Sequence, residues 1–185
     1  LLLAWQKIFV IIVSRTEVSS AGLNFTRKYE MNLGMSDKVT KLRTKVAKMM
    51  QDDIIPLEGE YLAEVNKGDR WTFTERQTEI IETLKTKAKN QNLWNFWLTD
   101  SNRGFGLTTV EYAYLAEEMG KAHIGAEVFN CSAPDTGNME VFERYGTTEM
   151  KERWLKPLLN GEIRSSYLMT EPEVASSDAT NLSLS

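Results

Sequence analysis

The residues best suited to chemistry lie in one stretch near the end of the sequence, SYLMTEPEVASSD at positions 166–178. Successive backbone N–H groups in a turn form a concave nest for phosphate oxygens, and Ser or Thr hydroxyls add donors without adding bulk. Ser, Thr, Asp and Pro also occupy ordinary loops, because they hydrogen-bond locally and stop helices. Composition alone therefore leaves two interpretations open, a connecting loop and an anion-binding turn.

The order of these residues favours the second interpretation. The run YLMTEP at 167–172, followed by SSD at 176–178, resembles the flavin-binding signature of the acyl-CoA dehydrogenases, Thr-Glu-Pro, two further residues and Gly-Ser-Asp. Here one extra residue follows Pro172, and Ser176 stands where the signature has Gly. We expect this spacing in a subfamily of large acyl-CoA dehydrogenases that carry a phosphotransferase-like domain upstream.

Three upstream stretches look like the N-terminal helical domain of the same family: DSNRGFGLT at 100–108, APDTGNME at 133–140 and RYGTTEMKERWLKPLLNGEI at 144–163. The resemblance runs from about Asp37 to Asn181. It implies an N-terminal portion of a FAD-dependent oxidoreductase that acts on an acyl-CoA thioester. Electron-transfer flavoprotein is the implied acceptor, a homo-oligomer the implied full-length assembly, and the mitochondrion or peroxisome the implied compartment.

The resemblance also assigns roles to residues of the signature. Met169 and Thr170 are expected near the flavin ring, Ser176 and Ser177 toward the pyrophosphate, and Ser177 also near the acyl-CoA. Asp178 is expected to brace the turn. The full set of expected flavin contacts is Tyr167, Leu168, Met169, Thr170, Glu171, Pro172, Ser176 and Ser177.

No residue of this chain is assigned as catalytic. The family's carboxylate base belongs to a later helical domain, and the chain is expected to stop at the opening of the β-domain that precedes it. Glu171 and Glu173 lie within the signature, but a carboxylate beside a pyrophosphate would repel it. We therefore expect both glutamates to be solvated or paired with Arg or Lys.

Composition limits the other function classes. With 185 residues and 42% hydrophobic content, the chain can bury one ordinary core. A net charge of -4 argues against a nucleic-acid partner, whose phosphates require a basic surface. Cys131 and His123 are each the single residue of their kind, so neither an intrachain disulfide nor a metal site is expected. His123 is interpreted as a helix-end side chain.

The fold class expected is all-α, a helical bundle over residues 36–165. Residues 1–35 form an irregular apolar N-terminus and linker, and residues 166–185 form the signature and the start of a β-domain. The apolar run at 1–13 is too short to span a bilayer. Only Ile163–Leu168 and Asn181–Ser185 have a strand-like pattern.

Capping residues divide the bundle into helices. Ser36 or Asp37 begins a helix that reaches about Met50, and the Asp52–Asp53 pair with Pro56 marks an end or a kink. Thr74 with Gln77 and Thr108 with Glu111 form capping boxes. The next helix is capped by Asp135 or Thr136. The last helix is capped by Thr147 or Thr148, and Pro157 bends it. The expected inward stripes are Ile80, Ile81, Leu84 and Ala88; Val110, Ala113, Tyr114, Ala116 and Met119; Met139, Phe142 and Tyr145; and Met150, Trp154, Leu155, Leu158 and Leu159.

Three features keep alternatives open. The basic run at 38–48 is either a solvated helix face or a contact to a membrane or CoA phosphate. The aromatic run LWNFWL at 93–98 is either core or one wall of a ligand cleft. The chain as a whole is either part of a flavoenzyme or a non-catalytic helical interaction module, with a yellow or a colourless purified protein as the discriminating observation.

Overall fold

Every regular element of the described residues is helical, as expected for an all-α protein. The computed structural model describes residues 33–69, 71–98, 103–168, 171–172 and 178–181. Within them η1 and η2 are single π-helical stretches and η3 is a 3₁₀ turn. The elements are α2 Asp37–Met49, η1 Met50–Ile54, α3 Ile55–Val65, α4 Glu75–Asn90, α5 Thr109–Met119, α6 Gly125–Val128, α7 Asp135–Tyr145, α8 Thr148–Met150, η2 Lys151–Leu155, α9 Lys156–Asn160 and η3 Ala179–Asn181.

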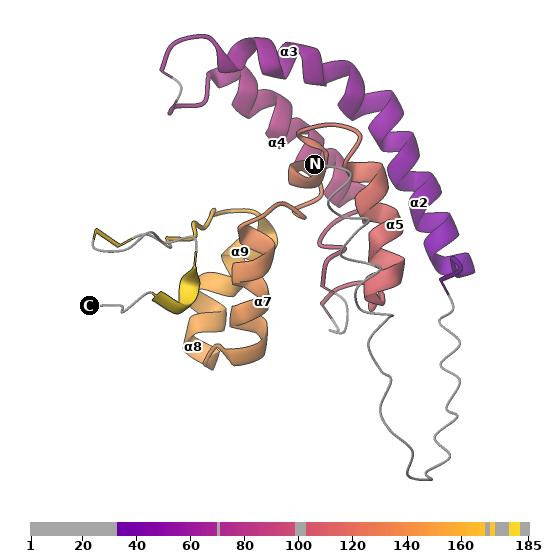
Figure 1. The fold of residues 1–185 in the computed structure, drawn as a ribbon. Helices are drawn as coiled ribbons and strands as arrows, with labels where there is room; N and C mark the ends of the chain where they lie inside the picture. Colours follow the sequence, from indigo (N-terminus) through magenta and orange to yellow (C-terminus); the bar gives the residue numbers. More distant parts are fainter. Residues whose placement is uncertain (1–32, 70, 99–102, 169–170, 173–177, 182–185) are drawn as a thin grey trace, which may run out of the picture. The chain divides into compact units, whose positions relative to one another are not determined.

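Two prolines lie just after the two π-helical stretches. Pro56 follows η1 and Pro157 follows η2, and in Figure 1 the ribbon runs from α2 into α3 as one bent helix. Proline lacks an N–H group, and its ring clashes with the carbonyl four residues earlier in an α-helix. A wider π turn relieves that clash. The helix expected to end or kink near Pro56 therefore continues, with the N–H of Ile55 donating to Met50 O.

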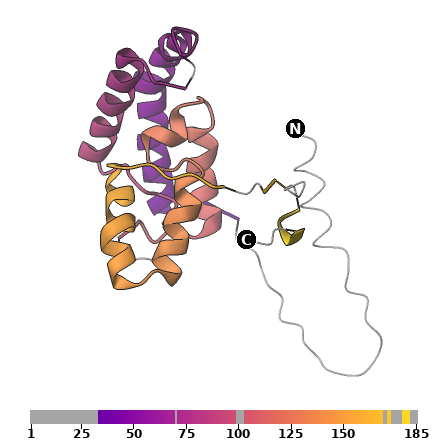
Figure 2. The same ribbon diagram turned by 90° about the vertical axis from the view of Figure 1, so that its left-hand side faces the viewer.

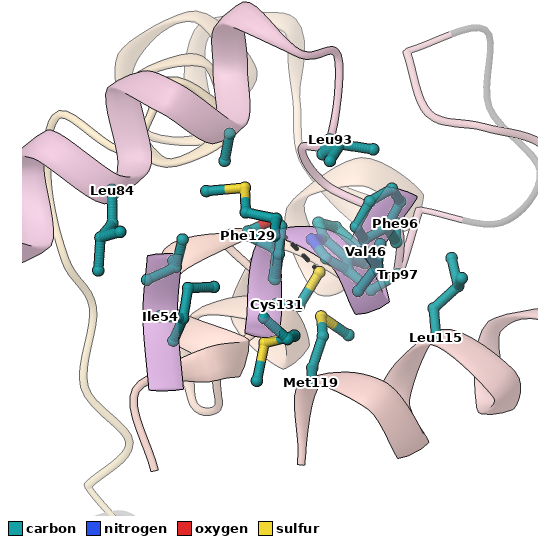
Figure 3. Packing of buried hydrophobic residues seen from close by; sticks show 14 of the residues in the cluster. Val46, Ile54, Leu84, Leu93, Phe96, Trp97, Leu115, Met119, Phe129 and Cys131 are labelled. Atoms are coloured by element: carbon teal, nitrogen blue, oxygen red, sulfur yellow. Dashed lines mark hydrogen bonds between the residues drawn. The ribbon is translucent and has the colours of Figure 1, made fainter. Parts of the chain in front are cut away.

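Pairs of helices enclose one cluster of buried apolar side chains, which we call the apolar core. Helix α2 packs on α5, α3 on α4, α4 on α6, and α7 on η2 and α9 (Figures 1 and 2). Figure 3 shows side chains of this core, among them Val46, Ile54, Phe96 and Phe129. The ring centroids of Phe96 and Phe129 lie 5.7 Å apart. Four of the six residues in the aromatic run 93–98 are fully or almost fully buried side chains of this core, namely Leu93, Phe96, Trp97 and Leu98.

Four of the predicted helix starts are confirmed by their hydrogen bonds. The hydroxyl oxygens of Thr74 and Thr108 each accept from the backbone N–H three residues later, and the Gln77 and Glu111 side chains bond back to the cap. Ser36 and Thr147 cap their helices in the same way, without the reciprocal bond. The stripe Ile80, Ile81, Leu84 and Ala88 is buried as predicted.

Several inward-facing predictions were wrong. Val110 is exposed, and α5 buries Leu115 and Glu118, which were not predicted, beside Met119, which was. The reason is that Glu118 pairs with Arg43 of α2 (2.7 Å), so a charged contact occupies a position that an apolar pattern does not predict. Further exposed residues that were expected inside are Ala113, Tyr145, Met150 and Trp154.

The strand-like stretch Ile163–Leu168 forms no strand in the structure. A strand requires a neighbour to pair its backbone groups, and the described residues provide no partner strand for this stretch. The N–H of Ser165 instead donates to a side chain of α7. Of the second strand-like stretch, Asn181 ends the 3₁₀ turn η3, and residues 182–185 lie outside the described residues.

None of the helices formed by the described residues combines the length and the apolar character needed to cross a membrane.

Candidate functional site

The signature segment is exposed where it begins. The side chains of Tyr167 and Leu168 are 67% and 91% exposed, Pro172 is exposed, and Glu171 is half-buried. Met169, Thr170, Glu173, Ser176 and Ser177 lie outside the described residues. The two large apolar side chains at its start are therefore available to a ligand or to another protein surface.

Asp178, near the end of the signature, braces the turn that follows it. Its Oδ1 accepts from the backbone N–H of Thr180 (3.0 Å) and from the Thr180 hydroxyl (2.7 Å). These bonds to the charged form, first the hydroxyl and then the N–H, lower the pKa of Asp178. The carboxylate is thus engaged within its own turn, as the sequence predicted.

The residues just before the signature are held by a buried carboxylate of α7. Asp135 is 5% exposed, and its Oδ1 accepts from both the backbone N–H (2.7 Å) and the hydroxyl (2.5 Å) of Ser165. Asn138, one turn along α7, donates to Ser165 Oγ (2.9 Å) and Ser166 O (3.2 Å). Asp135 was predicted to cap α7; it is the first residue of that helix, and its side chain bonds the distant segment instead.

A chain of ion pairs extends this contact across the helices. Arg164 Nε lies 3.1 Å from Asp135 Oδ2, and Arg164 Nη1 lies 2.6 Å from Glu127 Oε1. Glu127 also pairs with Lys85 of α4 (2.7 Å), whose side chain is only 6% exposed. Charge-assisted bonds of this kind are shorter and stronger than neutral ones and fix geometry. We call Lys85, Glu127, Asp135, Asn138, Arg164 and Ser165 the anchor.

A mainly apolar hollow of about 360 Å³ adjoins the anchor. Phe142 and Trp154 contribute aromatic surface, and Asn138 and Ser166 contribute polar atoms. A small apolar hollow with a few placed polar groups is typical of organic ligand sites. Its remaining lining residues are Val141, Leu158, Ile163, Arg164 and Ser165.

The end of α9 is fixed by side-chain donors from far along the sequence. Trp94 Nε1 donates to Leu159 O (2.7 Å), Asn130 Nδ2 to Leu158 O (3.0 Å), and Lys89 Nζ to Asn160 O (2.6 Å). Asn95 Nδ2 adds a bond to Leu159 O, and its Oδ1 accepts from Asn130 (2.7 Å). These donors satisfy the carbonyls that a helix end leaves open. We call the four side chains of Lys89, Trp94, Asn95 and Asn130 the polar seam.

Local backbone geometry makes the polar seam possible. Asn95 and Asn130 adopt positive φ angles of 59° and 54°, a region that Asn tolerates better than most residues. Gly161 has φ 69°, and a Cβ added there would lie 2.9 Å from the Trp94 ring. Glycine is therefore required at position 161 by its backbone angle and by the close indole.

A second hollow, of about 570 Å³, lies beside the polar seam. Its charged lining combines cations and carboxylates, and none of its lining residues belongs to the signature. The charged residues are Lys89, Arg103, Lys151, Lys156, Glu152 and Glu162.

The Cys131 thiol is not an activated nucleophile. Burial raises the pKa of the Cys131 thiol to about 12, so it is protonated at neutral pH. His123 is exposed, and its backbone N–H donates to Glu58. No group of three or more potential metal ligands occurs among the residues that the structure describes.

Comparison with known proteins identifies the family to which this chain belongs. The family model described as "Acyl-CoA dehydrogenase, N-terminal domain" matches residues 36–162, more than half of the chain. The chain belongs to the acyl-CoA dehydrogenase family. The match ends before the signature segment, so the helices rather than the signature carry it.

Individual relatives agree with the family model. Acyl-CoA dehydrogenase family member 10 of Mus musculus is 50% identical over 157 residues, which cover 82% of this chain and 14% of the relative. Acyl-CoA dehydrogenase family member 11 of Gallus gallus is 45% identical over 154 residues, 81% of this chain and 19% of the relative. The chain therefore spans less than a fifth of the length of either relative.

A solved structure shows the same fold. The protein from Mycobacterium abscessus, described as an acyl-CoA dehydrogenase, is 44% identical, with a TM-score of 0.72 over 81% of this chain and 38% of that one. The all-α helical domain predicted from the capping pattern is the N-terminal domain of this family.

Reasoning from the sequence missed the anchor. Its signal was weak, because Arg164 and Ser165 follow a helix end and Asp135 stands where a cap is expected. A pairing between positions thirty residues apart leaves no trace in one sequence. The position of Arg164 directly before a ligand signature was the only available hint.

Proposed function

We propose that this chain supplies the N-terminal helical part of a FAD-dependent acyl-CoA dehydrogenase, which oxidises the bond between the α and β carbons of an acyl-CoA thioester. One observation carries the proposal. A segment with the order of the family's flavin signature leaves the helical domain directly after Ser165, which α7 holds by three side-chain hydrogen bonds.

Three features of the described residues support a flavin site. Tyr167 and Leu168 expose apolar surface of the kind a flat ring system covers. Asp178 bonds its own turn, which keeps its charge engaged there instead of facing a pyrophosphate. The apolar hollow beside Ser166 offers further contact area. When bound, the flavin would supply the acceptor for the hydride that leaves the β carbon.

The chain's own residues would bind and orient rather than react. Met169 and Thr170 would lie near the ring, and the hydroxyls of Ser176 and Ser177 would donate to the pyrophosphate, with Ser177 also near the acyl-CoA. Tyr167, Leu168, Glu171 and Pro172 would complete the wall. We assign no catalytic base to these 185 residues, so we expect no turnover of substrate by these residues alone.

The wider context is part of the same proposal. The electron acceptor would be electron-transfer flavoprotein, the complete enzyme a homo-oligomer, and the compartment the mitochondrion or the peroxisome. No nucleic acid partner is proposed, because the chain carries a net charge of -4.

A chimaera tests the proposal. These residues would replace the matched part of the Mycobacterium abscessus protein, with which they share 44% identity. We expect a yellow protein with one FAD per chain that reduces an acceptor dye on addition of acyl-CoA. Ser177→Ala should weaken flavin retention, and Ser183→Ala, outside the signature, should not. A folded chimaera without flavin would overturn the proposal.

A non-catalytic helical interaction module is the second candidate. It is favoured by the exposure of Trp71 (81%) and Phe73 (66%), large side chains that usually indicate a contact surface. Under that function the chimaera stays colourless, and Trp71→Ser abolishes binding to a partner. Under the flavoenzyme function Trp71→Ser leaves flavin content unchanged.

A further inference from the structure

The anchor contains the most deeply buried carboxylate next to the signature, and nothing in the proposed chemistry uses it. Asp135 is 5% exposed and makes contacts with two consecutive residues, Arg164 and Ser165. A buried carboxylate requires compensation by charge or hydrogen bonds, and here one oxygen takes two bonds from Ser165 while the other faces Arg164. All of that compensation comes from the segment that leads into Tyr167.

We propose that Asp135 is a positioning residue, which sets where the flavin-signature segment leaves the helical domain. This inference rests on the proposed function for its consequence, but its geometry is independent of it. The N–H of Ser165 is a backbone group, so its donation to Asp135 Oδ1 fixes the path of the main chain and not only a side chain. Asn138 fixes the peptide between Ser166 and Tyr167 through Ser166 O (3.2 Å).

The orientation of Asp135 is itself fixed from three helices. Arg164 lies between Asp135 of α7 and Glu127 of α6, and Glu127 pairs with Lys85 of α4. Asp135 and Lys85 are buried, whereas the Arg164 side chain is 51% exposed. Ion pairs of this kind add little net stability compared with apolar packing, and their best attested use is to select one arrangement. The anchor therefore ties the first residue of the signature to helices that belong to the apolar core.

Ligand binding should be sensitive to small shifts of the signature segment. A contact misplaced by about 1 Å can cost about a hundredfold in a site that depends on orientation. Tyr167 and Leu168 directly follow Ser166, whose carbonyl is hydrogen-bonded to Asn138. A shift of the main chain at Ser165 would therefore move both residues. Loss of Asp135 should thus weaken flavin binding while the helices remain folded.

The test compares Asp135→Ala, the near-isosteric Asp135→Asn and a control on the same helix, Glu140→Gln. Glu140 pairs only with Arg144 on the surface of α7 among the contacts described (2.6 Å). In the 185-residue chain, amide hydrogen exchange at Ser165 should be at least about tenfold faster in Asp135→Ala and intermediate in Asp135→Asn. The amide of Met139, one turn along α7, should be unchanged.

In the chimaera, FAD dissociation constants should rise about tenfold for Asp135→Ala, less for Asp135→Asn and not at all for Glu140→Gln. Unaltered exchange at Ser165, or equal acceleration at Ser165 and Met139, would overturn the inference. If Asp135→Ala fails to fold, Asp135→Asn decides on the same two readouts. An unmodified chimaera without FAD would end the proposed function, while a selective change at Ser165 would still support the anchor.

Discussion

The apolar core and the polar seam hold helices together by different physics. In the apolar core, Phe96, Phe129 and Met50 are fully buried and make no directed bonds through their side chains. In the polar seam, Asn95 and Asn130 are buried amides that bond each other and the end of α9. Apolar contact depends on area and is non-directional, whereas hydrogen bonds require particular distances and angles.

This difference assigns separate tasks to the two regions. The apolar core provides most of the stability, because each large side chain removes much apolar area from water. The polar seam and the anchor provide position, because their bonds are satisfied in one arrangement of α9 and of residues 164–166. The segment proposed to bind flavin starts from the region that is positioned, not from the region that is merely buried.

The largest effect is expected in the apolar core. Phe96→Ala should lower the free energy of unfolding by about 3–5 kcal/mol, because it leaves a cavity where packing was complete. Urea unfolding followed by tryptophan fluorescence measures it. Burial raises the pKa of the Cys131 thiol to about 12 in the folded chain, which keeps the thiol protonated. In Phe96→Ala this thiol should also become reactive to iodoacetamide. Val141→Ala, at a side chain 56% exposed, is the control, and similar losses in both variants would contradict the account.

The polar seam should give the next largest effect. Asn130→Ala removes the donor to Leu158 O and the partner of Asn95, and leaving buried polar groups unsatisfied costs about 2–3 kcal/mol. Asn92→Ala is a matched control, since Asn92 has the same φ of 54° but is exposed. The difference between the two variants isolates the hydrogen bonds from the backbone strain. Equal destabilisation would show that the seam contributes nothing beyond that strain.

A charged contact inside the core region should respond to pH. Burial alone would raise the pKa of Glu118, but bonds and charges from Lys121 and Arg43 outweigh it, and the pKa is lowered. Glu118 therefore stabilises the fold above the unfolded-state pKa of about 4.3, and this contribution disappears as pH falls through the lower folded-state pKa. Glu118→Gln should cost about 1–2 kcal/mol at pH 7. The gap between variant and parent should shrink below about pH 4, and a constant gap would argue against the ion pairs.

The smallest effect concerns a helix start. Thr108→Ala removes the hydroxyl that accepts from Glu111 N–H (3.2 Å) and should cost about 1 kcal/mol. Thr109→Ala, at the next exposed position, should be nearly neutral. A thermal melt resolves this difference, and equal melting temperatures for the two variants would contradict the capping assignment.

Local rules predicted four helix starts, and the resemblance gave the family, but neither predicted the contacts between distant segments. The caps at Thr74, Thr108 and Thr147 could be predicted because capping depends on residues three positions apart. The exposure of Val110 and Tyr145 was not predicted, because the apolar character of a residue does not show which neighbour, if any, covers its side chain. The predicted strand at 163–168 failed for the related reason that strands depend on a partner.

The candidate site divides along the same line. The order of residues 166–178 carried the resemblance to the flavin signature, and the bracing role of Asp178 depends on a residue only two positions away. The anchor joins Asp135 to Ser165 across thirty positions, which sequence spacing does not reveal. The placement of Met169, Thr170, Ser176 and Ser177 stays a prediction.

A crystal structure of the flavin-bound chimaera tests the central claim most directly. The account predicts that Thr170 and Ser177 both contact the flavin and that the N–H of Ser165 still donates to Asp135. A flavin bound away from residues 167–177, or Thr170 and Ser177 on opposite sides of the molecule, would contradict it.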